Sequence, residues 1–158
     1  MAIKESSKYI LEAISGVLIL LLALILGIFF RTDDVKETEK AMKTQKNLLE
    51  LRLALEKYYN KTGKYPKLGV DGSSEDLKRV PPHIIKAKSI YFKDIYGKEK
   101  IESTEATDKL KESNKINVIK SLENVTLDGG WNYNPSIGEI HANLPNNIYL
   151  QNIIWSEE

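Results

Sequence analysis

A single carboxylate stands at the edge of a long apolar run near the start of the chain. Glu12 directly precedes the uncharged residues 13–30, "AISGVLILLLALILGIFF". An isolated charge costs about 2.5–3.5 kcal/mol at the centre of a membrane helix and less near its end, so Glu12 needs a cationic partner. Lys8 lies four residues earlier, and on a helix such a pair contributes about 0.3–0.5 kcal/mol. A cation from a neighbouring chain is the other interpretation, and the residue types leave both open.

The remaining residues that could do chemistry form no recognisable catalytic or metal-binding set. His83 and His141 are far apart and lack neighbouring ligands or carboxylates at useful spacing, so we predict surface histidines. The chain has no GxSxG, HExxH or phosphate-binding glycine loop, and no cysteine. Residues 71–76, "DGSSED", could hold calcium through oxygen atoms, but a solvated turn is the simpler interpretation. We therefore predict no catalytic residue, no metal and no cofactor, and a protein that is not an enzyme.

Length and charge restrict the remaining classes. The chain has 158 residues, with 23 basic and 22 acidic side chains. This balance gives no electrostatic reason to expect a nucleic-acid partner. Outside the apolar run the chain is long enough to bury one small core and too short for two domains.

The apolar run has the length of a membrane anchor. As a helix, residues 13–30 would measure about 27 Å, close to the roughly 30 Å hydrocarbon core of a bilayer. The following "FFRTDD" is a poor cleavage site for a secretory signal, so we expect an anchor that stays in place. Lys4 and Lys8 precede the run, and this mild positive bias favours residues 1–12 in the cytoplasm and the C-terminal part outside.

The helix is expected to continue beyond the anchor over residues 31–62. No proline interrupts this segment, and Leu48, Leu51, Leu55 and Tyr58 form an apolar stripe at helical spacing. Residues 35–46 are mostly polar and predict either a solvated stretch or a surface that contacts a neighbouring chain. Gly63 and the later Pro66 predict the end of the helix.

The C-terminal part, residues 63–158, is predicted to be rich in loops with a small β-sheet. Trp131–Asn134 and residues 138–143 suit the two strands of a hairpin, with Trp131 and Tyr133 in its core. Residues 147–155 and 89–97 could add strands, a short helical turn could follow residue 73, and residues 98–115 suit an exposed loop. The predicted fold class is α+β, a long N-terminal helix packed on a small antiparallel sheet.

Three stretches together resemble the type IV pilin family, and especially its pseudopilins. They are "KYILEAISGVLILLLALILGIF" (8–29), "LRLALEKYYNKTGKYP" (51–66) and "GGWNYNPSIGEIHAN" (129–143). The alignment puts Ser7 at the residue after which the family is processed, Lys8 at the first mature residue and Glu12 at the family's glutamate. Where this chain has Ser7 and Lys8, the family has glycine and phenylalanine. The proline that is common inside the family's anchor helix is missing here.

The resemblance implies a structural subunit. It would be anchored in the bacterial inner membrane with its C-terminal domain extracytoplasmic, and would assemble into a type IV pilus or a secretion pseudopilus as a main, minor or tip subunit. The implied partners are membrane lipid, the assembly machinery and other pilin-like subunits in a homo- or hetero-oligomer. Glu12 would pair with the new N-terminal amine of a neighbouring subunit. The alternative is a single-pass anchored binding module that does not polymerise, because an uncut segment 1–7 would obstruct extraction into a filament.

Overall fold

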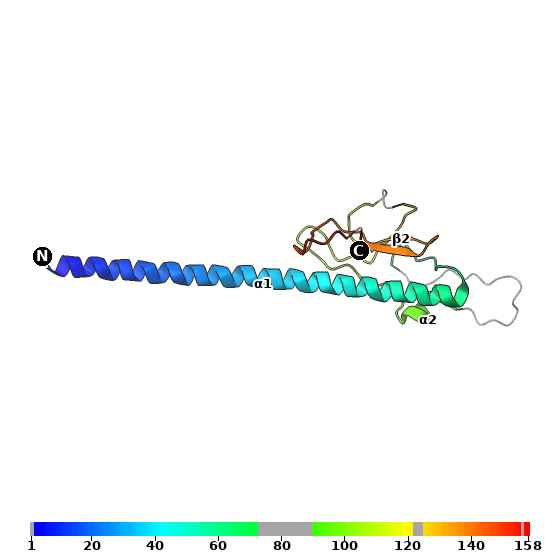
Figure 1. Ribbon diagram of the computed structural model, residues 1–158, viewed down its shortest axis with the longest axis horizontal. Coiled ribbons are helices and arrows are strands. Elements are labelled where there is room, and N and C mark those ends of the chain that lie inside the picture. Colours follow the sequence, from blue (N-terminus) through cyan, green and yellow to red (C-terminus); the bar gives the residue numbers. More distant parts are fainter. Residues whose placement is uncertain (1, 73–89, 122–124, 156) are drawn as a thin grey trace, which may run out of the picture. The chain divides into compact units, whose positions relative to one another are not determined.

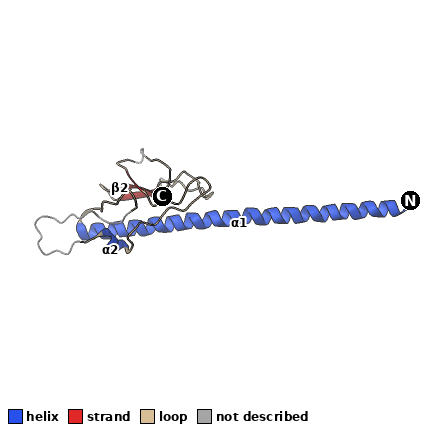
Figure 2. Ribbon diagram, turned by 180° about the vertical axis from the view of Figure 1, so that it is seen from behind, coloured by secondary structure: helices blue, strands red, loops and turns tan. Residues whose placement is uncertain are grey.

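The computed structural model describes residues 2–72, 90–121, 125–155 and 157–158, with the side chains of residues 2–13 and 30–32 excepted. Two helices and three strands form in this part of the chain (Figures 1 and 2). They are α1 (Ala2–Thr62), α2 (Phe92–Tyr96), β1 (Ile116–Val118), β2 (Trp131–Asn134) and β3 (Glu139–Ala142). The chain divides into two compact units, Met1–Glu37 and Thr38–Glu158. The fold class is α+β, as predicted.

Helix α1 ends where the sequence predicts. The first proline of the chain is Pro66, so no residue before it removes a backbone donor from the helix. Gly63 adopts the left-handed conformation with φ +70° and donates its N–H to the Tyr59 carbonyl 2.7 Å away. The Thr62 hydroxyl donates to the Tyr58 carbonyl at 2.8 Å. Both bonds satisfy carbonyl groups that would otherwise be unpaired at the helix end.

The apolar stripe of α1 lies in the core of the second unit. Leu51 and Leu55 are at most 1% exposed and belong to the same buried cluster as the residues of the hairpin. The core also includes Ala41, and Thr44 is fully buried beside it. The Thr44 hydroxyl lies 3.3 Å from the Tyr149 hydroxyl. The prediction of a solvated or intermolecular surface over residues 35–46 is therefore wrong at Ala41 and Thr44, which pack within their own chain.

The sheet is mixed rather than antiparallel. Strands β2 and β3 form the predicted antiparallel hairpin, with Trp131 opposite Ala142. Strand β1 joins the other edge of β2 in parallel, with Ile116 opposite Trp131. Gly130 has φ +79°, and a Cβ atom there would overlap the Lys115 carbonyl, which accepts the Trp131 N–H at 2.8 Å. Glycine is thus required where the backbone turns into this parallel pairing.

Two further predictions of strands are wrong. Residues 92–96 form the short helix α2, which Gly97 closes with φ +81°. Residues 147–155 form turns instead of a strand, and their buried anchors are Tyr149 and Trp155, whose rings meet edge to face at 5.5 Å. The expected helical turn after residue 73 lies outside the described residues.

Residues 98–115 are better fastened than an exposed loop. Ile101 is 2% exposed and Thr104 is fully buried. The Thr104 N–H donates to the Ser113 carbonyl at 2.9 Å, which closes a small bridge within the segment. The Thr104 hydroxyl also accepts the Gly130 N–H at 3.0 Å. The low apolar content of this segment favours an exposed loop, but hydrogen bonds allow its polar Thr104 side chain to be buried.

Candidate functional site

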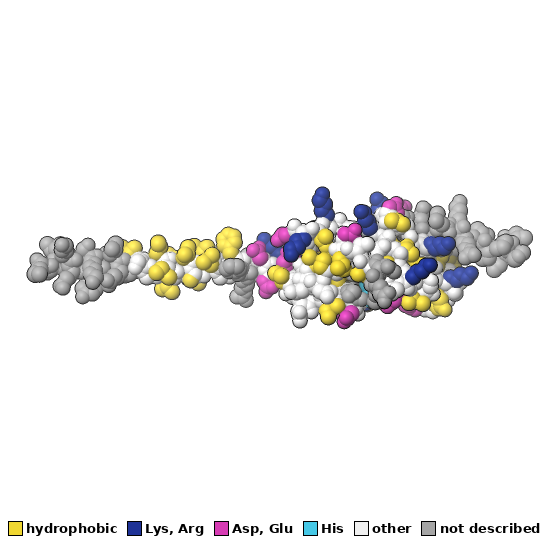
Figure 3. Space-filling view, turned by 90° about the horizontal axis from the view of Figure 1, so that it is seen from above, with side chains coloured by type: hydrophobic (Ala, Val, Ile, Leu, Met, Phe, Trp, Pro, Cys, Tyr) yellow, Lys and Arg dark blue, Asp and Glu magenta, His cyan; other side chains and the backbone are white. Residues whose placement is uncertain are grey.

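The first unit carries a continuous apolar surface on α1. The large apolar side chains between residues 14 and 29 are between 49% exposed, at Leu26, and 67% exposed, at Leu18 (yellow in Figure 3). By length and composition this is one helix long and apolar enough to cross a membrane. A surface of this kind is unfavourable in water and marks contact with lipid or with other apolar helices.

Ser7, Lys8 and Glu12 lie within the backbone of α1. Their side chains lie outside the described set, so the pairing of Glu12 with Lys8 or with another chain stays a prediction. The structure does place all three residues in the same helix as the apolar segment.

Trp131 and Tyr133 are fully buried side chains of β2. The Trp131 indole donates to the Glu102 carbonyl at 2.8 Å, and the Tyr133 hydroxyl donates to the Pro66 carbonyl at 2.8 Å. The two residues therefore join the hairpin both to the segment after α2 and to the turn after α1. Their surroundings make them parts of the core rather than a binding surface.

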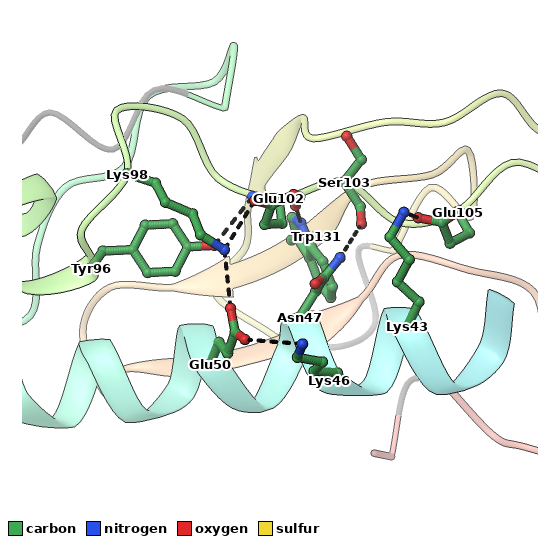
Figure 4. A network of polar contacts seen from close by, with 10 residues as sticks. All are labelled: Lys43, Lys46, Asn47, Glu50, Tyr96, Lys98, Glu102, Ser103, Glu105 and Trp131. Atoms are coloured by element: carbon green, nitrogen blue, oxygen red, sulfur yellow. Dashed lines mark hydrogen bonds and ion pairs between the residues drawn. The ribbon is translucent and has the colours of Figure 1, made fainter. Parts of the chain in front are cut away.

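A network of polar contacts fastens residues 98–105 to α1 (Figure 4). The Lys98 ammonium lies 3.1 Å from a Glu50 oxygen and 3.0 Å from a Glu102 oxygen. It also sits 5.4 Å from the centre of the Tyr96 ring. The hydrogen bonds to Glu102 and Glu50 raise the pKa of Lys98, against a smaller opposing effect of burial.

Two more contacts extend this network along the helix. The Lys43 ammonium lies 2.8 Å from a Glu105 oxygen, and this hydrogen bond raises the pKa of Lys43. The Asn47 amide donates to the Ser103 carbonyl at 3.0 Å. The Lys43 and Lys98 side chains are 61% and 40% exposed, so solvent screens both ion pairs and each contributes little to stability.

An open groove of about 490 Å³ lies in the second unit beside β3. Arg52 donates to the Ile140 carbonyl from Nη2 at 3.0 Å and to the Glu158 carbonyl, and partial burial lowers its pKa. His141 places Nδ1 2.8 Å from the same Glu158 carbonyl oxygen. The lining residues are Arg52, Glu56, Ile137, Gly138, Glu139, Ile140, His141, Glu157 and Glu158.

The groove corrects one expectation. His141 is 7% exposed, so it is a buried groove residue and not the surface histidine that the sequence predicts. His83 lies outside the described residues. The groove combines residues from α1, the hairpin and the C-terminal segment, and no local motif in the sequence marks that combination.

The acidic side chains of the described residues are not clustered as metal ligands. No three His, Asp or Glu side chains in that part of the chain are placed to hold a metal ion. Of the calcium candidate at 71–76, Asp71 and Gly72 are described, and Gly72 donates its N–H to the Gly69 carbonyl at 3.0 Å in a turn.

Comparison with family models, with curated proteins and with solved structures finds no match to this chain.

Proposed function

We propose that this protein is a pilin-like structural subunit, anchored by residues 13–30 in a bacterial inner membrane, with its second unit on the extracytoplasmic side. Its role is to assemble with related subunits into a type IV pilus or a secretion pseudopilus. The observation that carries the proposal is that two parts of α1 differ in the exposure of their apolar side chains. Residues 14–29 expose every large apolar side chain, whereas Leu51, Leu55 and their neighbours are buried in a core of the same chain.

The exposed segment needs cover. Burying one Leu, Ile or Val side chain is worth about 1.5–3 kcal/mol, so a run of them in water is strongly unfavourable. Lipid covers such a run before assembly, and neighbouring helices cover it in a filament. Lipid supplies no hydrophobic push between helices, so close packing and specific polar pairs must favour assembly.

Glu12 is the natural candidate for the specific pair. A carboxylate at the lip of the apolar run gains most from a cation that is also withdrawn from water. In the proposed assembly that cation is the amine of a neighbouring subunit processed after Ser7. The side chain of Lys8 is the local competitor, because it lies four residues before Glu12 in the same helix.

A second function is favoured by one specific observation. Ser7 and Lys8 replace the glycine and phenylalanine of the family's processing motif. If processing does not occur, residues 1–7 remain attached and the chain acts as a single-pass anchored binding module that does not polymerise.

The mature N-terminus separates the two functions. Full-length protein with a C-terminal tag is isolated from host membranes and from sheared surface material, and its first residue is determined by mass spectrometry. A chain that begins at Lys8 and co-purifies with pilin-like proteins supports the subunit. An intact chain in the membrane, with no such partner and none in the surface fraction, supports the anchored module.

Substitution of the carboxylate tests the mechanism within the first function. Glu12→Ala is expected to keep the chain in the membrane and to remove at least about nine-tenths of it from assembled material, since one buried charge pair governs assembly there. Glu39→Ala is the control, because Glu39 is an exposed carboxylate on the same helix outside the apolar run. Equal incorporation of both variants would remove Glu12 from the mechanism.

A further inference from the structure

The groove beside β3 is strongly acidic. The one arginine among its lining residues, Arg52, donates hydrogen bonds to the backbone oxygens of Ile140 and Glu158 and is attracted by the charges of Glu158 and Glu139. A single guanidinium does not balance the acidic side chains of the groove. Four carboxylates line the same groove and remain largely solvated: Glu56, Glu139, Glu157 and Glu158. Low-dielectric walls strengthen the field of such a cluster and favour a cationic occupant.

A buried acceptor in the groove points to the same kind of occupant. The side chain of His141 is 9% exposed, and its Nδ1 faces the Glu158 carbonyl, which can only accept a hydrogen bond. On the neutral ring the proton therefore belongs on Nδ1, and Nε2 is left as an acceptor. Nε2 has no hydrogen-bond partner in the described chain and lies 3.1 Å from a Glu139 oxygen. Nε2 is itself withdrawn from solvent, so a donor that enters the groove reaches the neighbouring Glu139 carboxylate, whose side chain is 44% exposed.

The wall of the groove suits a long cationic side chain. A Cβ atom on Gly138 would overlap the Tyr65 ring, so the ring lies directly against this part of the lining. Tyr65 donates its hydroxyl to Glu56 at 3.0 Å and stacks on Tyr59 with ring centres 4.6 Å apart. Ile137, 59% exposed, adds an apolar edge. Aromatic and apolar surface next to carboxylates accommodates the methylene stem and the ammonium group of lysine.

The same chain offers a matching donor. Lys57 and Lys61 are exposed and lie four residues apart near the end of α1, and the exposed Lys64 follows in the next turn. Within the described residues none of the three ammonium groups forms an ion pair. The i, i+4 spacing puts Lys57 and Lys61 on one face of the helix, where both can approach the same acceptor surface.

We propose that the acidic groove binds the lysine-bearing segment 57–64 of a second copy of this chain. The contact is heterologous, because none of the three lysines is among the lining residues of the groove, which they border on the helix side. Each copy can therefore give its lysines to one neighbour and accept those of another. This inference rests on the proposed function and deepens it by naming the partner of unit Thr38–Glu158 and the chemistry of the contact.

Charge exchange between two variants tests the proposal. Variant one is Lys57→Glu with Lys61→Glu, and variant two is Glu139→Lys with Glu157→Lys. Full-length chains in detergent micelles are examined by sedimentation at about 0.05 M and about 0.5 M salt, since screening at the higher salt weakens exposed charge pairs. Lys109→Glu with Lys111→Glu and Glu99→Lys with Glu112→Lys are the controls, because they make the same charge changes at exposed positions elsewhere.

The natural chain and both controls should self-associate at low salt. Each test variant alone should associate at least about tenfold more weakly, since two ion pairs of about 0.5–1 kcal/mol are replaced by repulsion. An equimolar mixture of the two test variants should recover the association, because lysines then face glutamates at every contact. Circular dichroism of each variant checks that the fold is kept.

Three results would overturn the proposal: a natural chain that is monomeric in micelles at low salt, test variants that associate as the controls do, or a mixture that fails to recover. Association that recovers in micelles while the chain is absent from assembled surface material would instead contradict only the proposed function. The two proposals can therefore fail separately.

Discussion

Truncation of Leu51 tests whether the second unit folds around α1. Leu51 is fully buried in the core cluster, whereas Leu49, two residues earlier on the same helix, is 58% exposed. Leu→Ala at a buried position removes transfer free energy and leaves a cavity, at a cost of about 3–5 kcal/mol. Leu49→Ala should change the free energy of unfolding by no more than about 0.5 kcal/mol, because alanine suits an exposed helix position at least as well as leucine.

The assay follows the fluorescence of Trp131 and Trp155, both fully buried, while the full-length chain is heated in detergent. For a unit the size of Thr38–Glu158, each kcal/mol lowers the melting temperature by about 3–6 °C, so Leu51→Ala should lose at least about 10 °C. Membrane association should be unchanged, since residues 14–29 are untouched. Melting temperatures of the Leu51 and Leu49 variants within about 2 °C of each other would refute the packing of α1 in this core.

Three further predictions concern the second unit. Gly138→Ala should destabilise it by about 1–3 kcal/mol more than Gly97→Ala in denaturant titrations, because both glycines have positive φ but only at Gly138 would the new methyl group overlap a ring, that of Tyr65. Trp131→Phe should cost about 1–2 kcal/mol by the same assay, because the partly buried Glu102 carbonyl that accepts the indole N–H at 2.8 Å loses its donor. An unchanged midpoint would contradict this. Hydrogen bonds from a threonine hydroxyl and an asparagine amide lower the pKa of Asp128 below its ordinary value of 3.8. The contribution of Asp128 to the free energy of unfolding is therefore present above about pH 4 and is lost as the pH falls. Asp128→Asn should make the free energy of unfolding depend less on pH in the acid range.

The parts of the fold that sequence reasoning finds are those set by local patterns. The end of α1 follows from a glycine at a left-handed position, and the β2–β3 hairpin follows from alternating residues around an Asn-Pro turn. Strand β1 was missed because three residues carry little pattern and its partner lies well beyond it in the sequence. Helix α2 was missed because five residues are too few to distinguish a period of 3.6 from a period of two.

The candidate sites divide in the same way. The apolar surface of residues 14–29 can be predicted from composition alone, because a long run of apolar residues is recognised without knowing which residues it contacts. The groove could not be predicted, since it combines Arg52 of α1 with His141 of β3 and the distant Glu158. The buried Thr44 and Thr104 were missed for a related reason: a polar side chain enters a core only when its hydrogen-bond partners are already arranged.

The proposed assembly does not have to be coupled to the folding of this chain. The core face of α1 over Leu48–Tyr58 is covered by residues of its own chain, so the second unit does not need a neighbour to fold. The apolar surface at 14–29 has no such cover among the described residues, and a bilayer can supply it. In the proposed assembly, a subunit is therefore already folded in the membrane. Association then replaces lipid by neighbouring helices at residues 14–29 and solvent by lysines in the groove. Variants of the core should then change stability without changing partner choice, whereas variants of Glu12 or the groove should change assembly in a chain that still melts as the natural one does.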